Sequence, residues 1–282
     1  MPRWFTEHHP PGRYFCVVGS PIAHSRSPQI HAAFARQFGI ELIYERVEVA
    51  PGDLAGAVAE FHHAGGRGMN VTVPLKEEAW GLAAVLSPRA RLAGAANTLW
   101  FEAGQLAADN TDGVGLVRDL VVNHGIALAG RDILLLGAGG AARGVLPVLL
   151  EAGPARVTIS NRSPARARTL ADAFSAHAAV RCLDWGEAPS APPDLVINAT
   201  SLSLHGEVPP LASDAVGPDT VCYDMVYAPT GTPFTRWAAS HGARLAVDGL
   251  GMLVEQAGAA FEIWHGVAPR TAAVIEALRQ DG

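Results

Sequence analysis

Hydrophobic and polar positions along the first third of the chain alternate between two periods, which predicts strands that alternate with helices. Apolar or alternating runs at residues 14–19, 42–49 and 69–73 are expected to be strands. Between them, residues 29–38 form an amphipathic run and residues 52–64 also predict a helix. Because strands joined through helices usually pair in parallel, this run predicts a mainly parallel sheet.

The same reading continues to the C-terminus. Short helices are expected at residues 75–80 and 87–92, and residues 105–108 are expected to be the return strand of a hairpin. An amphipathic helix is expected to follow Asp112 and to end at about residue 124. Later strands are expected at 133–136, 156–160, 178–183, 194–198, 221–226 and 244–247, with helices at 232–240 and near 269–278. The predicted fold class is therefore α/β, with two domains.

Length, composition and charge indicate a globular protein and argue against nucleic-acid, membrane and metal-binding classes. With 282 residues, 49% of them apolar, the chain is long enough for two cores. A net charge of −6 argues against nucleic acid as a partner. Three distant cysteines, no apolar run of membrane-spanning length and no apolar leader favour a reduced cytoplasm and no membrane. None of the histidines stands at metal-ligand spacing, so no metal site is expected.

Lys76 is the single lysine among 21 Lys and Arg residues. It follows the strand 69–73 and Pro74, in the first turn of an expected helix. Arginine stays protonated in proteins, whereas lysine can release its proton. Lys76 is therefore a candidate acid–base group, and the alternative is an ordinary surface lysine.

Hydroxyl and carboxylate side chains stand at two other helix starts. Ser25 and Ser27 lie where a strand passes into a helix, a place that suits a bound carboxylate. Ser27 is also expected to be the N-cap, with Pro28 as the first helical residue. Asp112 is read as an N-cap as well, a role compatible with catalysis through its second oxygen.

A glycine-rich turn follows the strand 133–136. Gly137, Gly139 and Ala142 fit the Gly-x-Gly-x-x-Gly/Ala pattern of dinucleotide sites. Gly137 would allow the tight turn, and Gly139 would let a pyrophosphate approach the backbone. The residues between them, also predicted to contact the cofactor, are Ala138, Gly140 and Ala141.

The next strand ends in Asn161, Arg162 and Ser163, with Arg166 one helical turn further on. An NAD-preferring site usually carries an acidic residue here for the ribose hydroxyl. Two guanidinium groups beside a hydroxyl instead favour a 2′-phosphate, and the predicted cofactor is NADP.

Four motifs, in order, resemble the shikimate dehydrogenase family. They are Pro-Ile-x-His-Ser-x-Ser-Pro at residues 21–28, Asn-Val-Thr-x-Pro-x-Lys at 70–76, Gly-Ala-x-Asn-Thr at 94–98 and Asp-Asn-Thr-Asp-Gly at 109–113. The matches span roughly residues 14–275. The resemblance implies a substrate-binding and catalytic domain at 1–112, completed by 249–282, and a Rossmann-type NADP domain at 113–248, with a cleft between them.

The resemblance also implies the reaction and several residue roles. The expected activity is NADPH-dependent, reversible reduction of 3-dehydroshikimate to shikimate on the route to chorismate and the aromatic amino acids, with Lys76 and Asp112 as the proton-transfer pair. Ser25, Ser27 and Tyr227 would hold the substrate carboxylate, Thr72, Asn97 and Gln256 its hydroxyls, and Thr200, Gly249 and Met252 the cofactor. Ser203 departs from the family, in which glycine is common at this place.

Three alternatives remain open at the level of sequence. The first is a dehydrogenase of broader specificity that acts on quinate and shikimate. The second is a non-catalytic regulator that binds NADP or a metabolite on the same fold, and the third is a structural or interaction protein. Retention of both Lys76 and Asp112 argues against a regulator. The expected assembly is a monomer or a homodimer.

Overall fold

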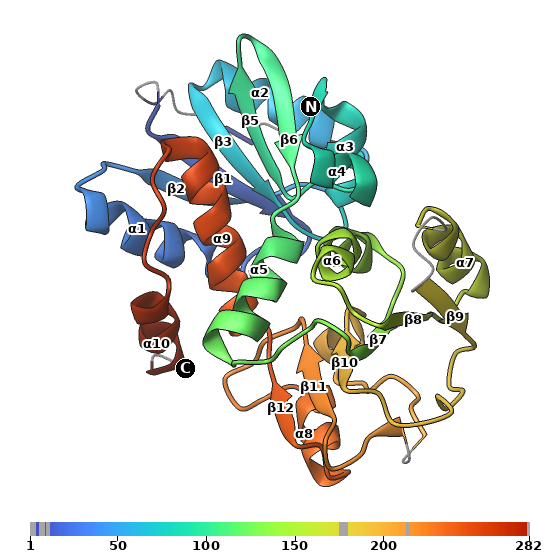
Figure 1. Cartoon of the computed structure of the whole chain (residues 1–282). Helices are drawn as coiled ribbons and strands as arrows, with labels where there is room; N and C mark the ends of the chain where they lie inside the picture. The colour runs from blue at the N-terminus through green and yellow to red at the C-terminus, as the bar shows by residue number, and fades with distance from the viewer. Residues whose placement is uncertain (1–3, 6–8, 10–11, 175–179, 213–214, 281–282) are drawn as a thin grey trace. The chain divides into compact units, whose positions relative to one another are not determined.

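The computed structural model describes residues 4–5, 9, 12–174, 180–212 and 215–280. The chain divides into two compact units (Figure 1). Unit 1 consists of Met1–Gly115 and Val254–Glu276, and unit 2 of Leu116–Leu253 and Ala277–Gly282. Among the residues that the structure describes, no helix has the length and apolar character needed to cross a bilayer.

Unit 1 is built on a six-stranded mixed sheet of order β2-β1-β3-β5-β6-β4. Three strands, β1, β2 and β3, pair in parallel, β5 and β6 form an antiparallel hairpin beside β3, and β4 pairs in parallel with β6. The bounds are Tyr14–Gly19 (β1), Ile43–Glu48 (β2), Gly66–Val71 (β3), Val85–Leu86 (β4), Thr98–Glu102 (β5) and Gln105–Asp109 (β6). The two-residue strand β4 was not expected from the sequence.

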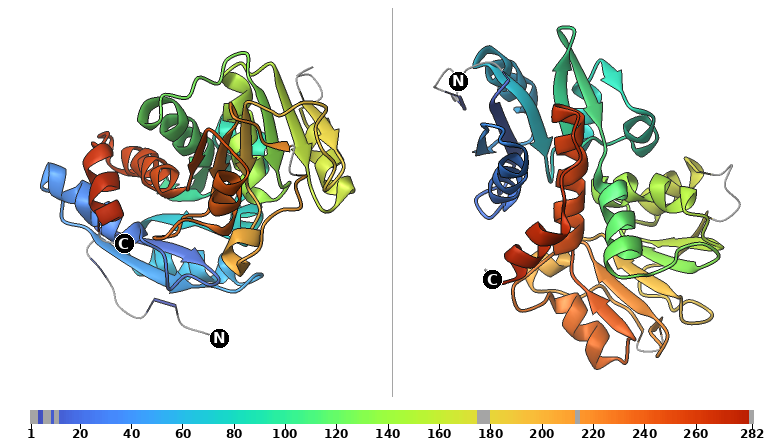
Figure 2. Two further views of the ribbon diagram at one scale, coloured as in Figure 1. Left: turned by 90° about the horizontal axis from the view of Figure 1, so that it is seen from below. Right: turned by 60° about the vertical axis from the view of Figure 1, so that its left-hand side comes forward.

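β3 starts and ends earlier than its apolar pattern predicts. It includes Gly66 and Gly68, which the pattern excluded. At Gly68 an added Cβ would lie 2.5 Å from the indole of Trp264, so glycine is needed for the close packing of helix α9 (Leu250–His265) on the strand. The same long helix is visible from two further directions in Figure 2. Tertiary packing therefore decides a boundary that local hydrophobicity placed elsewhere.

Two N-cap predictions in unit 1 differ from the structure. Helix α1 begins at Ser27 itself, and its N-cap is Arg26, without a side-chain cap bond. Helix α5 begins at Asp112, because the carbonyl of Thr111 accepts the N–H of Gly115. The N-cap predictions for Ser27 and Asp112 are therefore wrong, and both side chains are left for other partners. The other helices of unit 1 are α2 (Leu54–His63), α3 (Lys76–Leu82) and α4 (Pro88–Ala93), and α10 (Ala272–Gln280) begins in unit 1 and ends in unit 2.

The single helix expected after Asp112, ending at about residue 124, consists of two elements in the structure. The α-helical part, α5, ends at Arg118, and a π-helical turn, η1, covers Asp119–Asn123. π-Turns inside helices frequently mark functional positions, because they displace side chains from the regular helical face.

Unit 2 contains a six-stranded sheet in which every pairing is parallel. Its order, β12-β11-β10-β7-β8-β9, is the doubly wound order with the first strand at the centre. The strands are β7 (Asp132–Leu136), β8 (Arg156–Ser160), β9 (Val180–Leu183), β10 (Leu195–Asn198), β11 (Val221–Asp224) and β12 (Leu245–Val247). The helices are α6 (Gly140–Glu151), α7 (Pro164–Asp172), the 3₁₀ turn η2 (Leu202–His205) and α8 (Pro233–Ser240). Residues 178–179 of an expected strand lie outside the described residues.

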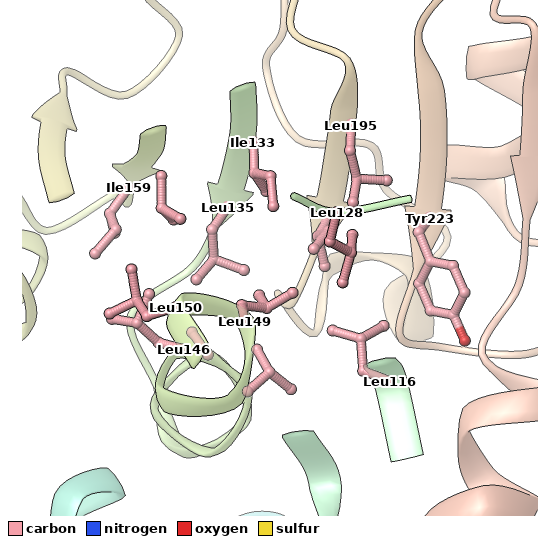
Figure 3. Close-up of a cluster of buried hydrophobic side chains, with 14 of the residues drawn as sticks. Leu116, Leu128, Ile133, Leu135, Leu146, Leu149, Leu150, Ile159, Leu195 and Tyr223 are labelled. Atoms are coloured by element: carbon pink, nitrogen blue, oxygen red, sulfur yellow. The ribbon is translucent and has the colours of Figure 1, made fainter. Parts of the chain in front are cut away.

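The main core of unit 2 lies between this sheet and helix α6 (Figure 3). Ile133 and Leu135 of β7 point toward Leu146 and Leu149 of α6, and each of the four is at most 1% exposed. Full burial of such a side chain contributes about 1.5–3 kcal/mol. Helix α6 is therefore packed against β7. The predicted α/β fold class, with a Rossmann-type domain, is confirmed by the parallel sheet and its helices.

Candidate functional site

Lys76 and Asp112 form an ion pair in unit 1. The Lys76 Nζ lies 2.5 Å from Asp112 Oδ2, and the two side chains are 12% and 6% exposed. The other carboxylate oxygen of Asp112 accepts a hydrogen bond from Asn97 Nδ2 at 2.9 Å. A proton can move along a direct N–H···O contact of this length, so the pair has the geometry of an acid–base couple.

Local chain geometry explains how Lys76 reaches this place. After β3, the Thr72 N–H donates to the Val18 carbonyl at 2.9 Å, and the Leu75 N–H then donates back to the Thr72 carbonyl at 3.0 Å. This turn leads into α3, which starts at Lys76, one residue later than expected, so Lys76 lies in the first helical turn as predicted. The half-buried Thr72 thus lies at the carboxyl end of β3, on the same short segment as Lys76.

The carboxylate of Asp112 does not cap helix α5, and the first backbone N–H of the helix is bound by the side chain of Asn110. The Asp112 N–H donates to Asn110 Oδ1 at 3.1 Å. Both oxygens of Asp112 are thereby available to Lys76 and Asn97.

Asn97 is the centre of the polar cluster around the pair. Its Oδ1 accepts the N–H of Thr111 at 2.8 Å, and its Nδ2 lies 3.1 Å from Gln256 Oε1 on α9. The structure thus brings together Lys76, Asp112, Asn97 and Gln256, which are widely separated in sequence. Amide and hydroxyl groups of this kind can bind a polyhydroxy ligand.

Ser25 and Ser27 bond to each other. The Ser25 hydroxyl donates to Ser27 Oγ at 3.1 Å, and the Ser27 N–H approaches Ser25 Oγ at 3.3 Å. Ser27 also bonds to Tyr44, whose hydroxyl donates to Asn70 Oδ1 at 2.6 Å. Burial raises the pKa of Tyr44 well above its usual value, so the phenol remains a neutral donor.

Sequence reasoning did not single out Tyr44 or Asn70 for any contact. Asn70 Nδ2 lies 3.2 Å from the Asn97 carbonyl, so it links the serine pair with the cluster around Asp112. The available signal was one amide side chain inside an otherwise apolar strand, since buried polar groups usually serve a hydrogen-bond network.

In unit 2, the glycine-rich turn joins β7 to α6. Gly137 has φ of 112°, a backbone conformation that favours glycine, and an added Cβ would lie 3.1 Å from the Ala199 carbonyl oxygen. Both the backbone conformation and the lack of space disfavour a side chain here. Gly139 is the N-cap of α6, and an added Cβ would meet nothing within 4 Å. Gly139 therefore leaves open space beside the backbone at the N-terminus of α6, where Gly140 and Ala141 are half-buried and Ala138 is buried. This arrangement fits a pyrophosphate.

The second cofactor segment lies between β8 and α7. Arg162, Ser163 and Arg166 are exposed, and Asn161 Nδ2 donates to the Ser163 carbonyl at 2.9 Å. Ser163 is the N-cap of α7 but makes no side-chain cap bond. Within the described part of the chain, neither guanidinium group forms an ion pair. The donor set fits a phosphate group on the ribose.

Thr200 belongs to a bonded turn after β10. Its hydroxyl and N–H both donate to Asn198 Oδ1, at 2.7 Å and 3.1 Å. Asn198 in turn donates to Asp224, which also accepts the hydroxyl of Ser203 at 2.6 Å. Burial raises the pKa of Asp224. Ser203, the departure noted in the sequence, therefore ties this turn to the end of β11.

The remaining predicted residues lie after β11 and at the start of α9. An added Cβ at Gly249 would lie 2.3 Å from the Met225 carbonyl oxygen, so this turn requires glycine. Met252 is 6% exposed and belongs to the core of unit 2. Tyr227 is half-buried on the segment that follows β11.

Segments of both units are similar to known proteins of one family. Residues 17–99 match the family model "Shikimate dehydrogenase substrate binding domain", residues 120–205 match "Shikimate / quinate 5-dehydrogenase", and residues 249–279 match "Shikimate 5'-dehydrogenase C-terminal domain". A protein of Alkalilimnicola ehrlichii named shikimate dehydrogenase (NADP(+)) is 53% identical over 267 residues, which cover 95% of this chain and 98% of that protein.

Two solved structures extend the comparison. The Ael1 enzyme from Pseudomonas putida has a TM-score of 0.87 and 44% identity, over 94% of this chain and 98% of that one. The shikimate 5-dehydrogenase of Thermus thermophilus, in complex with NADP(H) and shikimate, has a TM-score of 0.85 and 36% identity, over 95% and 99% of the two chains. This chain belongs to the shikimate dehydrogenase family.

Proposed function

We propose that this protein is an NADP-dependent shikimate dehydrogenase, which reversibly reduces 3-dehydroshikimate to shikimate. The observation that carries the proposal is the buried contact of 2.5 Å between Lys76 Nζ and Asp112 Oδ2, in a chain 53% identical to a relative of that name. The reduction requires a hydride and a proton, and Lys76, paired with Asp112, supplies the proton.

NADPH, when bound, supplies the hydride to the ketone carbon. The task of this chain is then to hold the ketone and to deliver a proton to the oxygen that becomes an alkoxide. We assign that proton to Lys76 Nζ, with Asp112 orienting the ammonium group through Oδ2. In the reverse direction, Lys76 accepts the proton from the shikimate hydroxyl.

The other roles follow from the same proposal. The carboxylate of the substrate is bound by Ser25, Ser27 and Tyr227, and its ring hydroxyls by Thr72, Asn97 and Gln256. Unit 1 supplies most of these groups, which supports a substrate domain over residues 1–112, completed by 249–282.

Residues 113–248 are proposed as the NADP domain. The turn from Gly137 to Ala141 would hold the pyrophosphate, Arg162 and Arg166 the 2′-phosphate, and Thr200, Gly249 and Met252 the rest of the cofactor. We further propose a place in chorismate and aromatic amino acid biosynthesis, in the cytoplasm, as a monomer or homodimer.

The test is NADP-linked oxidation of shikimate by the purified protein, with quinate and NAD as paired controls. Turnover with shikimate and NADP alone is the expected result. Equal turnover with quinate would indicate the broader specificity, and binding of NADP without any turnover would favour a regulator.

Replacement of Lys76 by alanine tests the assigned proton transfer. The Lys76→Ala variant should lose about 10²–10⁴ in kcat, because a positioned acid–base group contributes that factor. An unchanged kcat with only a higher KM would contradict the assignment, since it would leave Lys76 a binding role alone.

A further inference from the structure

The carboxylate of Asp109 is almost fully buried, three residues before Asp112. Asp109 is 4% exposed, and its Oδ1 accepts the N–H of Asn110 at 2.7 Å and the hydroxyl of Ser87. Arg89, on α4, donates from Nη2 to Oδ2 at 2.5 Å and from Nε toward Oδ1 at 3.3 Å. Both carboxylate oxygens are therefore held by one guanidinium fork, which fixes the direction of the carboxyl plane.

A series of hydrogen bonds connects Asp109 with Asp112. The carbonyl of Asp109 accepts the Asn97 N–H at 3.1 Å. The Asn110 side chain donates to the Ala95 carbonyl at 2.9 Å and accepts the Asp112 N–H at 3.1 Å. The segment from Asp109 to Asp112 is thus a bonded frame rather than a free loop.

The backbone of Lys76 is also hydrogen-bonded to the loop that contains Asn97. Its carbonyl accepts the Ala96 N–H at 2.8 Å, while the side chain of Asn97, the next residue, donates to Asp112. The two members of the acid–base pair are therefore held by adjacent residues of one loop. Arg89 joins this frame from α4, a helix that carries none of the proposed substrate or cofactor residues.

We propose that Arg89 is a positioning residue for the Lys76–Asp112 pair, acting through the buried carboxylate of Asp109. The inference rests on the proposed function, because it concerns the proton-transfer step. Without the guanidinium group, Asp109 is a buried carboxylate deprived of its charged partner, which is costly unless the group moves toward water. Movement of Asp109 shifts Asn110 and Asp112, and the Nζ–Oδ2 contact is no longer held at its productive length.

The test compares Arg89→Met, which keeps the aliphatic stem, with the wild-type protein in the shikimate–NADP assay. We expect kcat to fall about tenfold to a hundredfold, the cost of a misplacement near 1 Å. The KM values for shikimate and NADP should stay unchanged. The solvent deuterium isotope effect on kcat should increase, because proton transfer becomes slower relative to the other steps.

Two further variants separate positioning from simple stability. Arg89→Lys should recover part of kcat, because an ammonium group neutralises Asp109 without the fork. Arg13→Met removes the exposed ion pair with Glu41 in the same unit and should leave kcat unchanged. If Arg89→Met does not fold, Asp109→Asn, of nearly the same shape, should show the same fall in kcat and larger isotope effect.

The outcomes distinguish this inference from the proposed function. An active wild-type protein, a slow Lys76→Ala variant and an Arg89→Met variant with wild-type kcat and isotope effect would overturn the inference alone. The inference would also be overturned if the loss in Arg89→Met vanished once rates were corrected for the folded fraction. An inactive wild-type protein would overturn both proposals.

Discussion

Lysine and arginine side chains have different proposed roles in this chain: Lys76 transfers a proton, and Arg162 and Arg166 bind a phosphate group. Lys76 is half-buried beside the buried Asp112, whereas Arg162, just before α7, and Arg166, in its first turn, are exposed. A proton donor has to be able to lose its proton, and a phosphate clamp has to stay charged and planar. The residue types match these two demands.

The exposed arginines should decide the choice between NADP and NAD. In an Arg162→Gln variant we expect the KM for NADP to rise about tenfold to a hundredfold, since a charged hydrogen bond contributes about 1.5–3 kcal/mol. The KM for NAD should change little. Steady-state kinetics with both cofactors measures the effect. Arg168→Gln, two residues beyond Arg166 and on another face of α7, is the matched control; an equal rise there would contradict the assignment.

His31 should make the protein sensitive to acid. Burial, and secondarily the nearby His265, lower the pKa of His31 to about 3, whereas a histidine in the unfolded chain has its usual pKa of about 6.5. The unfolded state therefore binds a proton that the folded state refuses. Stability is fully present above the unfolded pKa and decreases as the pH falls from there toward 3.

A variant that cannot titrate should flatten this dependence. For His31→Leu, the slope of unfolding free energy between pH 6 and 4 should be smaller by about 1.4 kcal/mol per pH unit. Urea unfolding at several pH values gives the slopes. The exposed His205, changed to Gln, is the control, and a slope identical in His31→Leu and wild type would disprove the effect.

At the scale of elements, the start of α9 is set by its contact with the π-turn η1. The side chain of Asp119 is 1% exposed, accepts the Tyr223 hydroxyl at 2.6 Å and bonds to Asn123 at 2.8 Å. An added Cβ at Gly251 would lie 2.0 Å from Asp119 Oδ1. The two elements can approach this closely only because Gly251 has no side chain.

The variant Gly251→Ala should consequently destabilise the protein by about 1–3 kcal/mol through overpacking. Thermal and urea unfolding measure the loss. The double variant Gly251→Ala/Asp119→Ala should be less destabilised than the sum of the two single variants, because the clash disappears with the carboxylate. Gly81→Ala in α3, where an added Cβ meets nothing within 4 Å, is the matched control and should not destabilise. Strict additivity in the double variant would contradict the clash.

Element types were largely predictable, whereas their ends were not. The pattern predicted β1, β7 and β8 with correct or nearly correct bounds, because β1 and β7 are almost entirely buried and β8 is largely so. Ser27 and Asp112 were misassigned as N-caps, because their side chains bond to Tyr44, Lys76 and Asn97 instead. A local capping preference of about 1 kcal/mol is easily outweighed by such tertiary partners.

At the scale of the whole molecule, the two units have separate cores and are proposed to bind different ligands. One core lies within unit 1 around Phe61 and Leu99, and another within unit 2 around Leu135 and Leu146. A ligand that binds only the folded form of one unit should stabilise that unit in particular.

Hydrogen exchange should therefore report each ligand in a different part of the chain. NADP alone should protect amides around residues 137–166, whereas shikimate alone should protect those around 72–76 and 95–112. Mass spectrometry of proteolytic fragments measures both. Protection of α6 by shikimate in the absence of NADP would contradict this assignment of ligands to units.

Sequence alone determined the family, the α/β class and the types of residue at the candidate site, because short motifs at strand ends carry their chemistry locally. Only the tertiary structure decided which side chains meet. The family resemblance already implied Lys76 and Asp112 as a pair, and the structure adds their direct contact. The hydrogen bonds of Asn97 and the ion pair of Arg89 with Asp109 were not predicted, and they join separate segments of unit 1. Their positions depend on how strands pair and helices pack, which no local pattern records.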